Sequence, residues 1–342
     1  MQFINGNDDD DGSNGNDDKY IEPIVLNSNI IDNNNTILQQ QINQWRSQGY
    51  ALLDNLLPIE LIDNAKIAIE HMVESSDVKV KDDFGLFGFP FDKDSNCLND
   101  IILHPTIIKL VQVLLKQDDV RLTQGEAWLK QSTDNKTKLS NQDQRMHMDW
   151  PNHTLLHPPE FDDPDVVAFI IYLDDVIECG GATAIVAREG DDDPLYQMPY
   201  IQMPGVGRHE WINDRSTAEE YFKNNDKEIY EFRQKLYDKE RYVKYKKGTV
   251  LVYRLDVWHR GTCMNSNKKR IVINAAYKKA NRDWLTNWEA GVATHAYDRL
   301  WGLIPTLSEE QKSLLGIPRL TDSYWTQQNK INIHARYHQQ HR

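Results

Sequence analysis

The chain has 342 residues, enough for one large domain or two small ones. Its 52 acidic residues outnumber its 39 basic ones, for a net charge of −13. This balance argues against a nucleic-acid partner and against binding to an anionic membrane surface, because both are bound through basic patches.

Cys97, Cys179 and Cys263 are far apart and form no CxxC pair, so we expect neither a disulfide framework nor a structural zinc site. The N-terminus is acidic and lacks the apolar stretch of a secretory leader, and no apolar run looks long enough to cross a bilayer. The C-terminus is not a peroxisomal tripeptide. We therefore expect a cytoplasmic protein.

The first 35 residues are rich in Asn, Asp and Gly, with eight acidic side chains against Lys19 alone. Such a segment contains too few apolar residues to repay the entropy lost on ordering. We predict a disordered tail over 1–35 and a single domain over 36–342.

Amphipathic patterns predict helices over 37–45, 58–73 and 105–115, with a strand around 49–52. From residue 120 onward the chain becomes rich in β-branched residues, and strands are predicted at 120–123, 127–130, 166–173, 180–186, 249–253 and 270–277. Short strands separated by turns favour a sandwich or jelly roll over a doubly wound parallel sheet. The expected class is mainly β with flanking helices.

Residues 215–243 are charged and helical in pattern, and they interrupt the run of strands. Ser216, with Glu219 three residues later, has the spacing of a capping box. This insertion either forms a lid over a site or is a solvated helix at one edge, and the sequence favours neither.

The triplet His147-Met148-Asp149 places an imidazole and a carboxylate on the same side of an extended chain, so both can reach one ion. A second imidazole, His259, follows the predicted strand 249–253. Two histidines and one carboxylate are the ligand set of non-heme Fe(II) oxygenases. The alternative is a His and an Asp making ordinary hydrogen bonds at a strand end.

Arg270 lies eleven residues beyond His259 and opens an apolar strand. A buried guanidinium is costly unless it meets an anion, and it binds carboxylates through two parallel hydrogen bonds. With the His/Asp/His set, Arg270 therefore predicts an Fe(II)/2-oxoglutarate dioxygenase. The alternative for Arg270 is an ion pair with a protein carboxylate.

The region from about residue 120 to 277 resembles the phytanoyl-CoA dioxygenase family of Fe(II)/2-oxoglutarate-dependent oxygenases, and the resemblance extends over roughly 40–330. It rests on the following motifs: His147-Met148-Asp149, Leu173-Asp174-Asp175, Gly180-Gly181-Ala182-Thr183, and His259 with Arg270. The resemblance implies a double-stranded β-helix, that is, a cupin-like jelly roll.

The resemblance also implies roles for individual residues. His147, Asp149 and His259 would bind Fe(II), and Arg270 would bind the distal carboxylate of 2-oxoglutarate. Family members often have a lysine on the strand before the first histidine that helps to bind the co-substrate. Lys130 matches best, and Lys136 and Lys138 compete with it.

The expected activity is hydroxylation of a small-molecule or acyl substrate with O2, releasing succinate and CO2, with ascorbate as an optional further requirement. Halogenating relatives have a small residue at the position of Asp149, so a carboxylate there favours hydroxylation. The rivals are a catalytically inactive jelly-roll binding protein and a metal-dependent enzyme that does not use 2-oxoglutarate. The sequence determines neither the substrate nor the oligomeric state.

Overall fold

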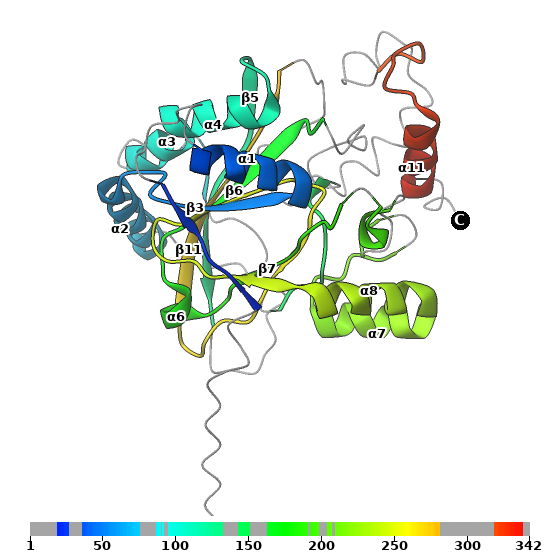
Figure 1. Cartoon of the computed structure of the whole chain (residues 1–342). Helices are drawn as coiled ribbons and strands as arrows, with labels where there is room; N and C mark the ends of the chain where they lie inside the picture. The colour runs from blue at the N-terminus through cyan, green and yellow to red at the C-terminus, as the bar shows by residue number, and fades with distance from the viewer. Residues whose placement is uncertain are drawn as a thin grey trace, which may run out of the picture.

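The structure is a computed structural model that describes residues 19–26, 36–75, 87–89, 91, 95–132, 143–150, 163–190, 192–197, 204–206, 209–280 and 318–337. In this part of the chain a larger and a smaller β-sheet share one apolar core, and helices lie against the outer face of the larger sheet (Figure 1). The predicted class, mainly β with flanking helices, is confirmed.

The larger sheet has seven strands among the described residues. In order across the sheet they are β2 (Ile24–Val25), β3 (Tyr50–Asp54), β9 (Val250–Tyr253), β6 (Val166–Tyr172), β11 (Lys269–Lys279), β5 (Val120–Gln131) and β4 (Phe87–Gly88). The two strands predicted at 120–123 and 127–130 are a single strand, β5, which pairs along β11 over its whole length. Its continuity comes from that long antiparallel partner, with one register shift between Ala276 and Tyr277.

The smaller sheet contains, in order, β1 (Tyr20–Ile21), β8 (Arg241–Val243), β7 (Thr183–Val186) and β10 (Trp258–Gly261). The predicted Gly-Gly turn precedes β7, and both glycines have a φ of +67°. A Cβ at Gly180 would lie 2.8 Å from the backbone nitrogen of Asn265, so the turn requires glycine for its conformation and for its space.

The structure corrects the prediction of a disordered tail for residues 19–26. Here β1 pairs in parallel with β8, and β2 pairs in parallel with β3. Ile21 and Leu26 are both buried, so two apolar side chains are enough to dock this short segment on existing strands. The rest of 1–35 lies outside the described residues, and the single domain over 36–342 stays a prediction.

Four helices pack on the larger sheet: α1 (Thr36–Gln48), α2 (Ile59–Ser75), α3 (Asn96–Ile102) and α4 (Pro105–Leu115). Alternation along β11 explains the two cores. Ile271 and Ile273 belong to the core under these helices, whereas Val272 belongs to the core between the sheets. Three of the helices were predicted, and α3 was not.

By length and composition, Asn96–Leu115 is apolar enough to cross a membrane, contrary to the expectation from sequence. In the structure this segment is two helices, because His104 caps the N-terminus of α4 and Pro105 begins it. The buried side chains of both helices belong to the core beneath the sheet, including Leu98, Ile107 and Leu110.

The insertion contains two helices, α7 (Arg215–Asn225) and α8 (Lys227–Lys239), followed by β8. The N-cap of α7 is Asp214, whose carboxylate accepts from the backbone of Thr217 at 2.9 Å, so the capping box predicted at Ser216 is wrong. Ser216 lies inside the helix and donates to Asp214. The remaining short helices are α6 (Val176–Cys179), η3 (Pro194–Tyr196) and α11 (Gln327–Tyr337).

Candidate metal centre

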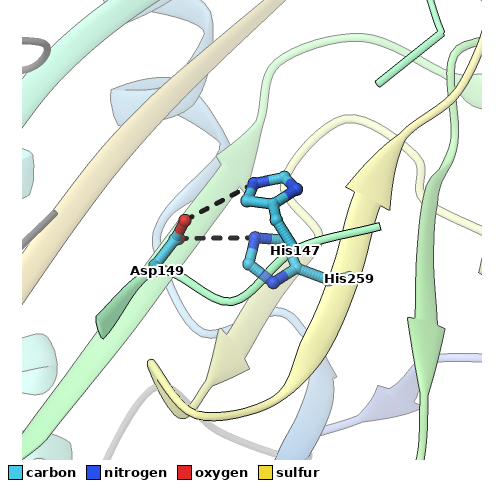
Figure 2. Close-up of side chains that lie close together, drawn as sticks. All are labelled: His147, Asp149 and His259. Carbon is cyan, nitrogen blue, oxygen red and sulfur yellow. Dashed lines mark ion pairs between the residues drawn. The ribbon is translucent and has the colours of Figure 1, made fainter. Parts of the chain in front are cut away.

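The structure brings His147, Asp149 and His259 together between the sheets, as the sequence predicted (Figure 2). The backbones of His147 and His259 form an isolated antiparallel bridge, with each N–H donating to the other carbonyl at 2.9 Å. The Nε2 atoms lie 3.5 Å and 3.3 Å, respectively, from the two carboxylate oxygens of Asp149. All three ligand atoms lie within 4.8 Å of one another, close enough to bind one ion.

Backbone carbonyls fix which nitrogen of each imidazole is available. The Nδ1 of His147 lies 3.0 Å from the carbonyl of Arg145, and the Nδ1 of His259 lies 3.0 Å from the carbonyl of Val257. Because a carbonyl only accepts, Nδ1 carries the proton and Nε2 presents its lone pair toward the other ligands. Two such nitrogens and one carboxylate fit a divalent iron.

Burial and neighbouring charges shift the pKa values of the two histidines. Burial, aided by the charge of Arg145, lowers the pKa of His147 well below its usual value, so this imidazole is neutral as a ligand must be. For His259 burial acts in the same direction, but the carboxylate of Asp149 outweighs it and raises the pKa. A metal ion would replace that proton at Nε2.

Tyr253 orients the carboxylate ligand. Its hydroxyl donates to Oδ2 of Asp149 at 2.7 Å, and its ring centroid lies 5.0 Å from that of His259. Burial, with the negative charge of Asp149, raises the pKa of Tyr253 well above its usual value, so the hydroxyl keeps its proton. The sequence analysis missed this residue, because nothing in the spacing of the motif connects β9 with Asp149.

Arg270 and Lys130 are cross-strand partners on β11 and β5, and so project from the same face of the sheet. Arg270 donates to the carbonyl of Gly181, and its Nε is buried without a hydrogen-bond partner. No ion pair joins it to a carboxylate among the described residues. The ion pair considered as the alternative for Arg270 is therefore not present in this part of the structure.

Lys130 is buried, and its Nζ donates to the carbonyl of Thr262 at 3.1 Å. Burial, together with the neighbouring charge of Arg270, lowers the pKa of Lys130 to about 7. The buried Lys130 and the partly buried Arg270, side by side, favour an anion between them. The competing candidates Lys136 and Lys138 lie outside the described residues.

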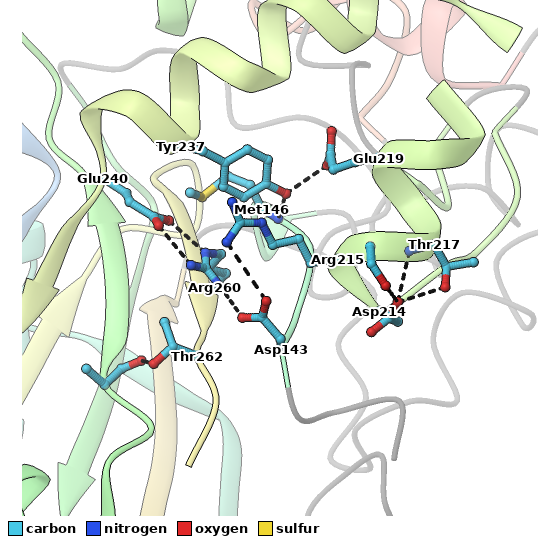
Figure 3. Close-up of polar contacts among 12 residues, drawn as sticks. Asp143, Met146, Asp214, Arg215, Thr217, Glu219, Tyr237, Glu240, Arg260 and Thr262 are labelled. Carbon is cyan, nitrogen blue, oxygen red and sulfur yellow. Dashed lines mark hydrogen bonds and ion pairs between the residues drawn. The ribbon is translucent and has the colours of Figure 1, made fainter. Parts of the chain in front are cut away.

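The helical insertion supports the segment that carries His147 and Asp149 (Figure 3). Arg233 of α8, whose side chain is fully buried, donates to the carbonyl of Met146 at 3.1 Å and to Glu219 of α7 at 2.8 Å. Tyr237 accepts from the backbone of Met146 at 3.1 Å and donates to Glu219 at 2.7 Å. Glu219, expected in a capping box, is instead the counter-ion of this cluster.

A second ion-pair cluster supports the strand that carries His259. Arg260 follows that ligand and binds both carboxylate oxygens of Glu240, at 2.7 Å and 2.8 Å. Its third nitrogen donates to Asp143, which precedes the His147 segment (Figure 3). The insertion is therefore not a solvated helix at one edge, because its side chains bind both segments that carry the ligands. Its role as a lid stays a prediction.

The sequence matches the family described as phytanoyl-CoA dioxygenase (PhyH) over residues 45–272, about two thirds of the chain. No curated protein matches it.

Among solved structures the fold is similar to the non-heme alpha ketoglutarate dependent carbocyclase SnoK from nogalamycin biosynthesis. Sequence identity is 14% over 83% of this chain and 94% of that one, with a TM-score of 0.50. Two further similar structures have lower TM-scores. The epimerase SnoN in complex with Fe3+, alpha ketoglutarate and nogalamycin RO gives 0.49, at 14% identity over 76% of this chain and 89% of that one. HygX from Streptomyces hygroscopicus with nickel and 2-oxoglutarate bound gives 0.47, at 13% identity over 73% and 89%.

The jelly roll and the His/Asp/His site thus define an enzyme of the Fe(II)/2-oxoglutarate-dependent class. Within that class, the chain belongs to the phytanoyl-CoA dioxygenase family. The resemblance seen in the sequence, and the iron and 2-oxoglutarate it implied, are confirmed at the level of the family.

Proposed function

We propose that this protein is an Fe(II)/2-oxoglutarate-dependent dioxygenase that hydroxylates a small-molecule or acyl substrate and releases succinate and CO2. The observation that carries the proposal is the His147, Asp149 and His259 cluster, with both Nε2 atoms turned toward one carboxylate. Three protein ligands leave positions open for the co-substrate and for O2.

Arg270 and Lys130 would bind the distal carboxylate of 2-oxoglutarate. Support comes from their cross-strand placement, from the orphaned Nε of Arg270 and from the low-dielectric burial of Lys130. A guanidinium in such a place forms strong, charge-assisted hydrogen bonds with a carboxylate. A binding module or a metal enzyme independent of 2-oxoglutarate has no need of this pair of basic side chains.

When bound, the iron supplies O2 activation coupled to oxidative decarboxylation of 2-oxoglutarate. The chain's own residues would fix the geometry: the carbonyls of Arg145 and Val257 hold the imidazole tautomers, and Tyr253 orients Asp149. Asp149 fills the ligand position that halogenating relatives leave to a halide, which favours hydroxylation. The carbocyclase SnoK shares the fold, so the fold alone does not distinguish hydroxylation from other oxidative outcomes.

We place the enzyme in the cytoplasm because all three cysteines are free thiols. Its partner would be a small-molecule substrate, with O2 and 2-oxoglutarate as co-substrates and ascorbate as an optional addition.

The test is O2-dependent formation of succinate from 2-oxoglutarate, with Arg270→Ala compared with Arg241→Ala, which removes an exposed arginine of β8. Loss of charge-assisted hydrogen bonds worth about 1.5–3 kcal/mol predicts a KM for 2-oxoglutarate raised roughly tenfold or more in Arg270→Ala. The control should keep the wild-type KM. Unchanged 2-oxoglutarate dependence in Arg270→Ala would remove Arg270 from the co-substrate site.

A further inference from the structure

Arg145 is a buried cation beside the metal centre. It lies two residues before His147 in the same extended segment, and its side chain is 3% exposed. Its Nη1 donates to Oδ1 of Asn213 at 2.6 Å, whereas its Nε is buried with no hydrogen-bond partner. Among the described residues no carboxylate forms an ion pair with it.

Three other buried arginines are matched by carboxylates. Arg233 binds Glu219, Arg254 binds Asp256 through two nitrogens at 2.9 Å, and Arg260 binds Glu240. A buried guanidinium without a counter-ion is costly, because it loses its hydration without replacement. Arg145 thus differs from these three arginines and shares with Arg270 a buried Nε that has no hydrogen-bond partner.

The guanidinium of Arg145 is held in place rather than left to move. It stacks on the indole of Trp211, with its Cζ 4.3 Å from the ring centroid, and Asn213 holds it from the side. Trp211 is 40% exposed, so one side of the stack faces solvent. Such a stack orients the fork of donors.

Arg145 interacts electrostatically with the neighbouring guanidinium of Arg233, which repels it, and with Asp149. Its charge also acts on both histidines of the triad. Asp149 is not available to neutralise it, because that carboxylate faces both imidazoles and accepts from Tyr253. The guanidinium of Arg145 is therefore already oriented to donate hydrogen bonds to an anion that binds near the metal.

We propose that Arg145 binds an anionic group of the primary substrate, a carboxylate or an oxyanion such as a sulfate or phosphate ester. This inference rests on the proposed function and narrows the substrate class to anionic small molecules. The carboxylate next to the oxo group of 2-oxoglutarate has the same chemistry, and the experiment separates the two sources.

The first arm measures 2-oxoglutarate affinity under nitrogen, by the visible band of the iron–oxoacid chelate, in wild type, Arg145→Gln and Arg241→Gln. Arg145→Gln also removes a positive charge near the metal ligands, so the reference is the probe affinity measured in the second arm, and 2-oxoglutarate affinity should fall less than probe affinity does. An equal or larger loss of 2-oxoglutarate affinity in Arg145→Gln, with Arg241→Gln unchanged, would assign Arg145 to 2-oxoglutarate and overturn its assignment to the primary substrate.

The second arm titrates benzoate, and separately sulfate, into protein already loaded with Fe(II) and 2-oxoglutarate, and follows binding by isothermal titration calorimetry, which does not depend on Trp211. We expect saturable binding to wild type and to Arg241→Gln, weakened about tenfold or more in Arg145→Gln. Trp211→Ala leaves Arg145 intact and changes a partly exposed side chain, so it is informative even if Arg145→Gln does not fold. It should weaken the probe severalfold through loss of the stack.

Equal probe affinity in wild type, Arg145→Gln and Trp211→Ala would overturn the inference, and so would the absence of saturable binding of both probes to wild type. Failure of the proposed function gives a different result, because the chelate band would then be missing from wild type itself.

Discussion

Replacing Tyr253 by Phe tests whether a single hydroxyl tunes the metal site. The change keeps the buried ring beside His259 and removes only the 2.7 Å hydrogen bond to Asp149. A hydrogen bond to a charged group contributes about 1.5–3 kcal/mol, and loss of an outer-shell partner typically costs 10–100-fold in metal affinity. We expect Fe(II) affinity to fall roughly tenfold, because the carboxylate loses the contact that sets its orientation.

The assay is anaerobic Fe(II) binding in competition with a chromogenic chelator. Tyr277→Phe is a matched control, since that hydroxyl is also buried and donates to the carbonyl of Ile102 in the core under the helices. The control should lose stability and keep the wild-type iron affinity. Fe(II) affinity of Tyr253→Phe within about twofold of wild type would refute the argument that Tyr253 positions Asp149.

Two further predictions concern the residues around the site. The pKa of Lys130 is about 7 in the folded protein, against an ordinary value of 10.5. Between those two pH values the unfolded chain binds more protons, so the free energy of unfolding should rise with pH across that window. Lys130→Met should flatten this rise in denaturant titrations of the metal-free protein, and an identical slope would contradict the burial argument. Arg233→Ala leaves Glu219 without its guanidinium and frees the carbonyl of Met146, so unfolding should cost about 3–5 kcal/mol less and Fe(II) should bind more weakly. A destabilised variant that binds Fe(II) as tightly as wild type would separate the insertion from the geometry of the site.

The features that depend on local sequence pattern were predicted correctly. Pro105 marks the start of α4 at the predicted residue, and the β-branched runs of β6 and β11 revealed the sheet. The ligand set was visible because two of its members sit two residues apart in an extended segment. His259 was found by chemistry alone, since its own strand, β10, is only four residues long.

What the sequence did not reveal depends on contacts between distant segments. Ser216 was chosen as a cap by spacing, but Asp214 is held by its bridge to Gln144 and takes the cap itself. Arg233 lies 87 residues from Met146, and no pattern within α8 indicates that contact. The docking of residues 19–26 likewise depends on strands that lie far away in the sequence.

The central claim is that His147, Asp149 and His259 bind Fe(II) with 2-oxoglutarate chelated beside them. The most direct measurement is an anaerobic titration with Fe(II) and then 2-oxoglutarate, recording the weak visible charge-transfer band of the chelate. We expect this band in wild type and its loss in His147→Ala and Asp149→Ala. A well-folded wild-type protein that shows no band, or an Asp149→Ala variant that keeps it, would contradict the claim.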